Sequence, residues 1–320
     1  MTRLHLSFFQ NSFLRLLLII TLSLAACLLP FAGLFFLLFL PLVLYVLCFL
    51  ADPGKTLITF LASLCVVAIL LWVLNTSAPA PALAAAGLAG MLMFWTVQKR
   101  FSVEGVVLLP SLLLVGAIAF YFIYGGMQLS ITPWQLVERH IQEAVELNIR
   151  LYSRLPLNAE EIQSIANSKP QMISLFTMIF PALCVIATVF SIWINLIAAG
   201  RLLRSRGILP SHLSALSEWS APAWLVWIFI AAGAMSAVPA PPVRFLGINL
   251  LLAVSFIYFL QGLAIVSFFF QQRNISSFFR FLVYFLIAIQ QMLMISIATV
   301  GFFNLWVDFR KYLRKDRTTD

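Results

Sequence analysis

The side chains that could do chemistry inside the apolar parts of this sequence are amides, a phenol and one carboxylate. Gln290, Asn304 and Asp308 fall on one face of the last apolar segment, since each residue of a helix turns by about 100°. Tyr258 and Gln261 form a similar face on the preceding segment. Two polar helix faces in lipid gain most by meeting each other. We therefore predict that these five residues converge on one polar intramembrane site, with the two segments as direct neighbours.

Two interpretations of this site remain open. The amides could simply hold helices together, each interhelical bond contributing about 0.6 kcal/mol. Alternatively, they could line a cavity for a polar small molecule, with Asp308 at its cytoplasmic end and Arg310 balancing the charge. A third polar face, on the apolar segment 171–199, leaves the same choice open; it consists of Cys184, Thr188, Ser191 and Asn195.

Catalytic and metal chemistry are not expected. The sequence has no serine–histidine pair, no paired aspartates and no glycine-rich phosphate loop in a plausible context. Its histidines are scattered, and its cysteines form no CxxC pair; these residues are His5, His140, His212, Cys27, Cys48, Cys65 and Cys184. We expect a non-enzymatic protein without a cofactor.

The composition decides which solvent surrounds these side chains. Hydrophobic residues make up 62% of the chain and charged residues only 10%, with a mean hydropathy of +1.03. Soluble domains are about 45–50% apolar and about 25% charged. The net charge of +9 lies in short loops and at the two ends, which is typical of a membrane protein rather than of a nucleic-acid partner. The chain must be embedded in a lipid bilayer.

Nine apolar segments are candidates for membrane crossing. Each must be helical, because a bilayer offers no water to satisfy free backbone groups. The fold class is therefore an all-α, polytopic transmembrane bundle in a single domain, 1–320, with eight to nine membrane segments. They lie at 13–29, 32–50, 57–74, 80–97, 105–124, 171–199, 221–238, 245–270 and 279–305.

Basic residues in the short loops give the orientation. Arginine or lysine follows the segments ending at 97, 199 and 270, so these loops belong in the cytoplasm of a bacterial inner membrane. Nine crossings would leave the basic tail 310–315 outside, against this rule. We expect both termini inside, because the last segment is interrupted by Gln290 and Gln291 and can bend back.

Residues 126–170 form the only sizeable extramembrane part. Thr132-Pro133-Trp134-Gln135 has the form of a helix start, with threonine as cap and glutamine three residues later. Apolar residues then recur at helical spacing, which predicts an amphipathic helix, and Asn158 begins a second, shorter one that ends near Ser168. A strap on the membrane surface and a lid over a cavity are both compatible with this pattern.

Small residues four apart mark a close helix contact in segment 80–97. Ala82, Ala86 and Gly90 form this candidate packing motif. The partner could be another helix of the chain or another membrane protein, and we favour internal packing. Pro181 is expected to kink segment 171–199.

The C-terminal half resembles a known family. Trp219 to Trp227, Asn249, Tyr258 to Ala264 and Gly301 to Arg310 have the order and spacing of the YybS-like bacterial membrane proteins, a domain of unknown function. The resemblance covers residues 10 to 315. That family often has aspartate before the final tryptophan, where this chain has Asn304.

The YybS-like proteins are distantly similar to substrate-binding subunits of energy-coupling-factor transporters. This resemblance implies a six-helix binding unit in the first six segments. Those subunits dock through small residues in their first helix, whereas here the pattern lies in the fourth segment, so no docking or ligand residue is carried over. The leading hypothesis is a membrane protein that binds or transports an unidentified solute. The alternative is a scaffold that organises other envelope proteins.

Overall fold

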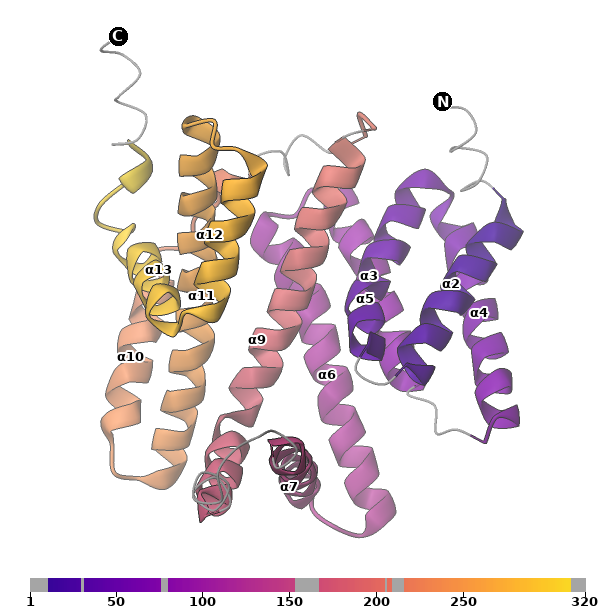
Figure 1. The fold of residues 1–320 in the computed structure, drawn as a ribbon, viewed down its shortest axis with the longest axis horizontal. Coiled ribbons are helices and arrows are strands. Elements are labelled where there is room, and N and C mark those ends of the chain that lie inside the picture. Colours follow the sequence, from indigo (N-terminus) through magenta and orange to yellow (C-terminus); the bar gives the residue numbers. More distant parts are fainter. Residues whose placement is uncertain are drawn as a thin grey trace. The chain divides into compact units, whose positions relative to one another are not determined.

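A computed structural model of the chain describes residues 11–29, 32–75, 80–152, 167–204, 206–208 and 216–311. Within these ranges the chain is helical and forms no β-strand, which confirms the predicted all-α class (Figure 1). The helices are α2 (Ser12–Leu28), α3 (Ala32–Leu50), α4 (Pro53–Val73), α5 (Ala80–Gln98), α6 (Val103–Leu129), α7 (Pro133–Tyr152), α9 (Lys169–Arg204), η2 (Leu216–Glu218), α10 (Leu225–Ala237), α11 (Pro241–Gln272), α12 (Ser277–Ile289) and α13 (Gln291–Phe303).

Six of the described helices are long and apolar enough to cross a membrane: α3, α4, α5, α6, α9 and α11. The bent pair α12–α13 could add a seventh span. Helices α2 and α10 are apolar but have only 17 and 13 residues. The structure thus supports six to seven spans and does not confirm the expected eight to nine.

The chain falls into two compact units. Unit 1 comprises residues 1–177 and 187–214, and unit 2 comprises residues 178–186 and 215–320. Helix α9 contributes to both, because its segment Met178–Ile186 belongs to unit 2. The expectation of a single domain stays a prediction.

Unit 1 is built on a close crossing of α3 and α5. A Cβ atom added to Gly90 would collide with the backbone of Pro41, and one added to Gly87 would collide with the ring of Phe60 in α4. Part of the predicted motif packs against another helix of this unit. It does so through Gly90 and the buried Ala86, whereas Ala82 is exposed.

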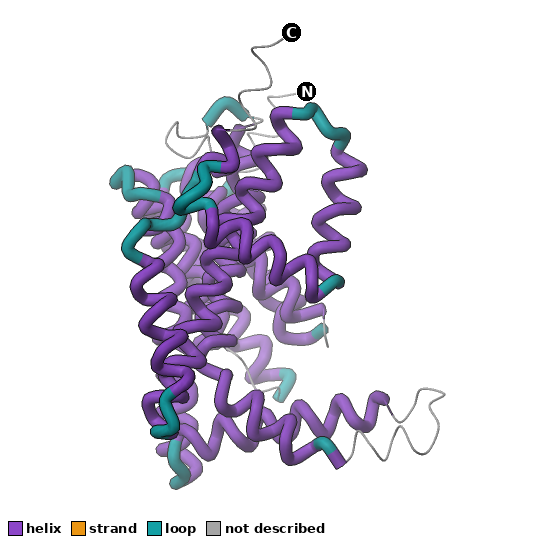
Figure 2. The backbone as a smooth tube through the Cα atoms, turned by 90° about the vertical axis from the view of Figure 1, so that its left-hand side faces the viewer, coloured by secondary structure: helices purple, strands orange, loops and turns teal. Residues whose placement is uncertain are grey.

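The predicted amphipathic helix is α7, which runs crosswise to α6 (Figure 2). Its start is the expected capping box: the Thr132 amide donates to Gln135 Oε1 at 2.8 Å, and the Gln135 amide donates to Thr132 Oγ1 at 3.2 Å. Leu136, Val137 and Val145 on its apolar face are buried. The second predicted helix, from Asn158, lies mostly outside the described residues.

Unit 2 contains a second close crossing, between α11 and α13. A Cβ atom on Gly262 would collide with the carbonyl of Ile297, and one on Gly301 would collide with the carbonyl of Tyr258. Helices α12 and α13 are bent by 103° at Gln290, so the predicted interruption of the last apolar segment is confirmed.

The bent pair starts at the C-terminal end of α11, and the chain that follows α13 returns toward that end. Helix α12 follows α11 after a short turn, and Arg280 in α12 donates to the carbonyls of Phe270 and Ile275 at 3.1 and 2.8 Å. Residues 308–311 return toward this end, where Arg310 donates to the Trp219 carbonyl and to the Ser220 hydroxyl. A hydroxyl–amide bond of 3.3 Å between Ser217 and Gln271 places this connecting segment beside the end of α11.

Candidate functional site

A polar cavity of about 490 Å³ lies in unit 2, where three segments distant in sequence meet. The segments are the stretch that precedes α10, the middle of α11 and the chain that follows α13. The lining residues are Glu218, Ser220, Ala221, Gln261, Asn304, Leu305, Asp308, Arg310 and Lys311. This volume is within the range of about 300–1,000 Å³ for small-molecule sites.

Arg310 holds one wall of the cavity in place. Its guanidinium is buried, and it donates from Nη1 to Ser220 Oγ and from Nη2 to the Trp219 carbonyl, both at 2.7 Å. The next residue, Ala221, donates its amide hydrogen to Gln261 Oε1 at 3.2 Å. The irregular segment 219–221 is thus tied to the C-terminal segment and to α11. Two side chains therefore replace the backbone partners that a regular helix would supply.

The amides of Gln261 and Asn304 keep hydrogen-bonding capacity in the cavity. The Nε2 group of the buried Gln261 has no acceptor among the described residues. Asn304 Oδ1 is buried and has no donor. A buried polar group left without a partner costs about 1–3 kcal/mol, so a molecule in the cavity that accepts from the N–H groups of Gln261 gains free energy.

Three of the five predicted site residues line this cavity. Gln261, Asn304 and Asp308 lie together, and α11 and α13 are direct neighbours, as the sequence indicated. Tyr258 does not line the cavity, and its ring packs against Phe229 and Phe302 at centroid distances of 5.7 and 5.2 Å.

The predicted convergence of Gln261, Gln290 and Asn304 on one site is wrong, because Gln290 does not line the cavity. Its side chain is exposed, and the residue caps α12 at the bend. The face that joins Gln290 to Asn304 exists only on a continuous helix, and the 103° bend breaks that face.

Two other buried amides serve helix packing. Asn249 in α11 donates from Nδ2 to the Met178 carbonyl at 2.9 Å and accepts from the Ala182 amide at 2.8 Å. In an uninterrupted helix the Ala182 amide would donate to the Met178 carbonyl, four residues earlier. The side-chain amide of Asn249 is therefore inserted between these two backbone groups of α9, beside Pro181. In unit 1, Asn195 donates to the Leu38 carbonyl of α3 at 2.8 Å.

Sequence reasoning missed Arg15. It belongs to the first turns of α2, and only 2% of its surface is exposed. Its Nη2 donates to Ser12 Oγ at 2.8 Å, while Nε and Nη1 are buried without a partner. Ile19 and Ser23 share its buried face, and this spacing of four residues was the available signal.

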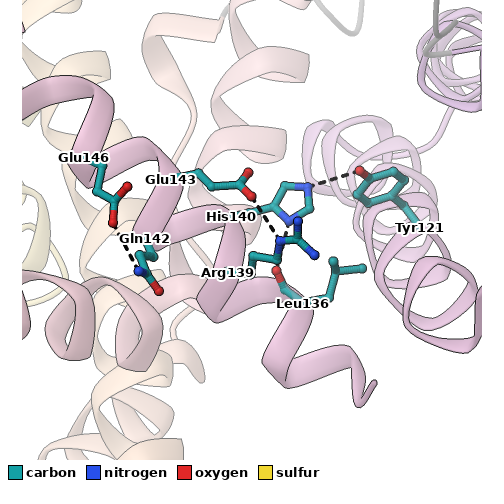
Figure 3. Close-up of polar contacts among 7 residues, drawn as sticks. All are labelled: Tyr121, Leu136, Arg139, His140, Gln142, Glu143 and Glu146. Carbon is teal, nitrogen blue, oxygen red and sulfur yellow. Dashed lines mark hydrogen bonds and ion pairs between the residues drawn. The ribbon is translucent and has the colours of Figure 1, made fainter. Parts of the chain in front are cut away.

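Polar contacts attach α7 to its neighbours in unit 1 (Figure 3). His140 donates from Nδ1 to the Leu136 carbonyl at 2.9 Å, and its Nε2 lies 3.2 Å from the hydroxyl of Tyr121 in α6. Glu146 Oε1 lies 2.7 Å from Lys169 Nζ at the start of α9. The hydrogen bond from Lys169 is the main cause that lowers the pKa of Glu146, followed by a bond from Gln142.

These contacts make α7 a packed strap on unit 1. Its role as a lid stays a prediction.

Comparison with known proteins identifies a family. A family model described as "Predicted membrane protein (DUF2232)" matches residues 17–305. No curated protein and no solved structure matches the chain. The resemblances to the YybS-like proteins and to the energy-coupling-factor subunits stay predictions.

Proposed function

The chain belongs to the DUF2232 family of predicted membrane proteins, and from this premise we propose that it binds and transports a small polar solute without catalysing a reaction. The observation that carries this proposal is the polar cavity of about 490 Å³ in unit 2. Helices held together only by amides would bring Gln261 and Asn304 into direct contact. Here a cavity lies between segments whose amides keep unused bonding capacity.

The backbone around the cavity supports the same function. Irregular backbone at membrane depth is tolerated only where it is buried in protein or lines a water-filled cavity. Residues 219–221 and 304–308 are irregular, and both segments contribute to the cavity lining. Secondary transporters place their substrate sites at such interrupted helices.

The charges favour a topology with eight crossings in a bacterial inner membrane and a re-entrant pair α12–α13. Helix α12 has 13 residues, about 20 Å, which is too short for a hydrocarbon core of about 30 Å. Helix α10 is equally short, but it must cross if the arginines after α9 and after α11 are both cytoplasmic. The cavity then opens toward the cytoplasmic half.

A scaffold for other envelope proteins is the second candidate. The observation in its favour is that Asn195 and Asn249 are both used for helix packing, so polar faces in this chain do not always indicate a ligand. Its partners would be other membrane proteins, and no nucleic acid is expected.

Purification from native membranes, followed by mass spectrometry of both small molecules and proteins, distinguishes the two. We expect a polar small molecule at a stoichiometric level that is lost in Gln261→Leu and retained in Gln290→Leu, the matched glutamine outside the cavity. A stoichiometric protein partner that is retained in both variants, with no small molecule, would favour the scaffold.

A further inference from the structure

The charges around the cavity of unit 2 narrow the class of solute. Two acidic and two basic side chains line it, so the lining is neutral overall; they are Glu218, Asp308, Arg310 and Lys311. A solute with a single charge is attracted by two of these side chains and repelled by the other two. A solute with both charges can be oriented so that each end meets its opposite.

Of the four charged side chains in the lining, we assign Asp308 and Lys311 to the two charges of such a solute. They are three residues apart, yet their side chains form no ion pair with each other, and Asp308 Oδ1 instead accepts from the Lys311 backbone amide at 3.3 Å. Among the described residues neither side chain is neutralised by another. The guanidinium of Arg310 donates to the hydroxyl of Ser220 and to the carbonyl of Trp219.

The side-chain amides of Asn304 and Gln261 suit the cationic and the anionic end of such a solute. Asn304 is the C-cap of α13, where helix carbonyls and the macrodipole favour a cation, and its Oδ1 lacks a donor. Gln261 presents N–H groups that lack an acceptor. One group therefore suits an ammonium and the other a carboxylate.

We propose that this cavity binds a small zwitterion of the amino-acid type. Its ammonium group lies near Asp308 and Asn304, and its carboxylate lies near Gln261 and Lys311. This inference rests on the proposed function, because it names the solute class of the same site.

Matched probes test the charge requirement. The full-length protein is placed in lipid nanodiscs with its native cysteines replaced by alanine and with Leu305→Cys as a reporter at the cavity wall. Alkylation of this cysteine is measured with alanine, propionate or ethylamine, and with γ-aminobutyrate, butyrate or butylamine. We expect a zwitterion to slow alkylation, and its single-charge analogues to bind about tenfold or more weakly, as for the loss of one charged contact.

Two variants assign the ends of the solute. Asp308→Asn should weaken binding of the zwitterion and strengthen binding of the carboxylate analogue. Lys311→Gln should weaken binding of the zwitterion and strengthen binding of the amine analogue. Gln290→Ala, at the exposed bend, should leave all probes unchanged. If these two charge variants leave the probe ranking unchanged, the proposed orientation is wrong.

The remaining outcomes separate this inference from the proposed function. Equal protection by propionate or ethylamine alone overturns the zwitterion and leaves solute binding intact. Protection by neutral glycerol but by no zwitterion also overturns the zwitterion proposal and leaves solute binding intact. If no probe, charged or neutral, slows alkylation of Leu305→Cys, both proposals are wrong.

Discussion

Two helix crossings in this protein share a sequence signal but differ in what surrounds them. In unit 1, α3 and α5 meet at Gly90 and Pro41, among buried apolar side chains such as Leu44 and Leu83. In unit 2, α11 and α13 meet at Gly262 and Gly301, beside a polar cavity. Small residues thus predict how closely two backbones approach, and they do not predict what fills the adjacent space.

The residues next to these glycines in the sequence explain why one crossing adjoins a polar cavity and the other is surrounded by apolar side chains. Next to Gly262 stands Gln261, and three residues after Gly301 stands Asn304. Both amides line the cavity, together with Ser220 and Ala221 of the irregular segment 219–221. In unit 1, Gly90 is flanked by Ala89 and Met91, so the space closes with apolar side chains.

Substituting the glycines is the largest expected perturbation of this comparison. Gly90→Ala and Gly301→Ala both place a Cβ against backbone atoms, so each should destabilise the protein by about 1–3 kcal/mol. Only Gly301→Ala should also weaken solute binding. Gly116→Ala, where an added Cβ meets nothing within 4 Å, is the control and should be neutral or stabilising by up to about 1 kcal/mol. Thermal unfolding in detergent and the Leu305→Cys assay measure both effects.

A loss of binding in Gly90→Ala would break the comparison, because the crossing in unit 1 would then also shape the site.

The strap gives the next largest effect and tests whether unit 1 depends on apolar burial. Ile141 lies half-buried on the apolar face of α7, so Ile141→Asp should cost about 1–3 kcal/mol for an unpaired charge. Glu143 is exposed in an ion pair of 3.1 Å with Arg139, and Glu143→Lys should change stability by about 1 kcal/mol or less. Equal melting temperatures of the two variants would show that α7 is not packed.

Two arginines, one in each unit, differ in their hydrogen-bond partners and should respond differently to substitution. Arg15 in unit 1 is buried with two nitrogens unpartnered, so Arg15→Met should be neutral or raise the melting temperature. Arg280 in unit 2 donates to the carbonyls of Phe270 and Ile275, and Arg280→Met should cost about 1.5–3 kcal/mol. A large loss of stability in Arg15→Met would mean that this guanidinium has an anionic partner in the membrane.

Acidification, which tests the ion pair of Glu146 in unit 1, gives the smallest effect. The pKa of Glu146 is lowered below its ordinary value of 4.5, mainly by the hydrogen bond from Lys169. A carboxyl whose folded-state pKa is lowered stabilises the protein above its unfolded-state pKa, and this contribution is lost as the pH falls through the folded-state value. Melting curves of the wild type and Glu146→Gln should therefore differ at neutral pH and converge in acid. A difference that stays constant would contradict this ion pair.

The sequence alone determined the elements of this protein. The solvent and the helical class follow from composition, because a chain with 10% charged residues cannot cover a water-facing surface. Local chemistry fixed the start of α7 at Thr132 and Gln135, and the interruption at Gln290. The close contact at Gly90 was also visible, since spacing along one helix defines a face.

Only the tertiary structure decided which faces meet. Arg310 and Ser220 are 90 residues apart, and Asn249 bonds to Met178 from 71 residues away, so no local pattern could pair them. Gln290 was excluded from the site because the bend moved it off the face it would share with Asn304 on a straight helix. Helical periodicity is a property of one segment. The choice of a partner depends instead on packing between distant segments, and on where each helix stops.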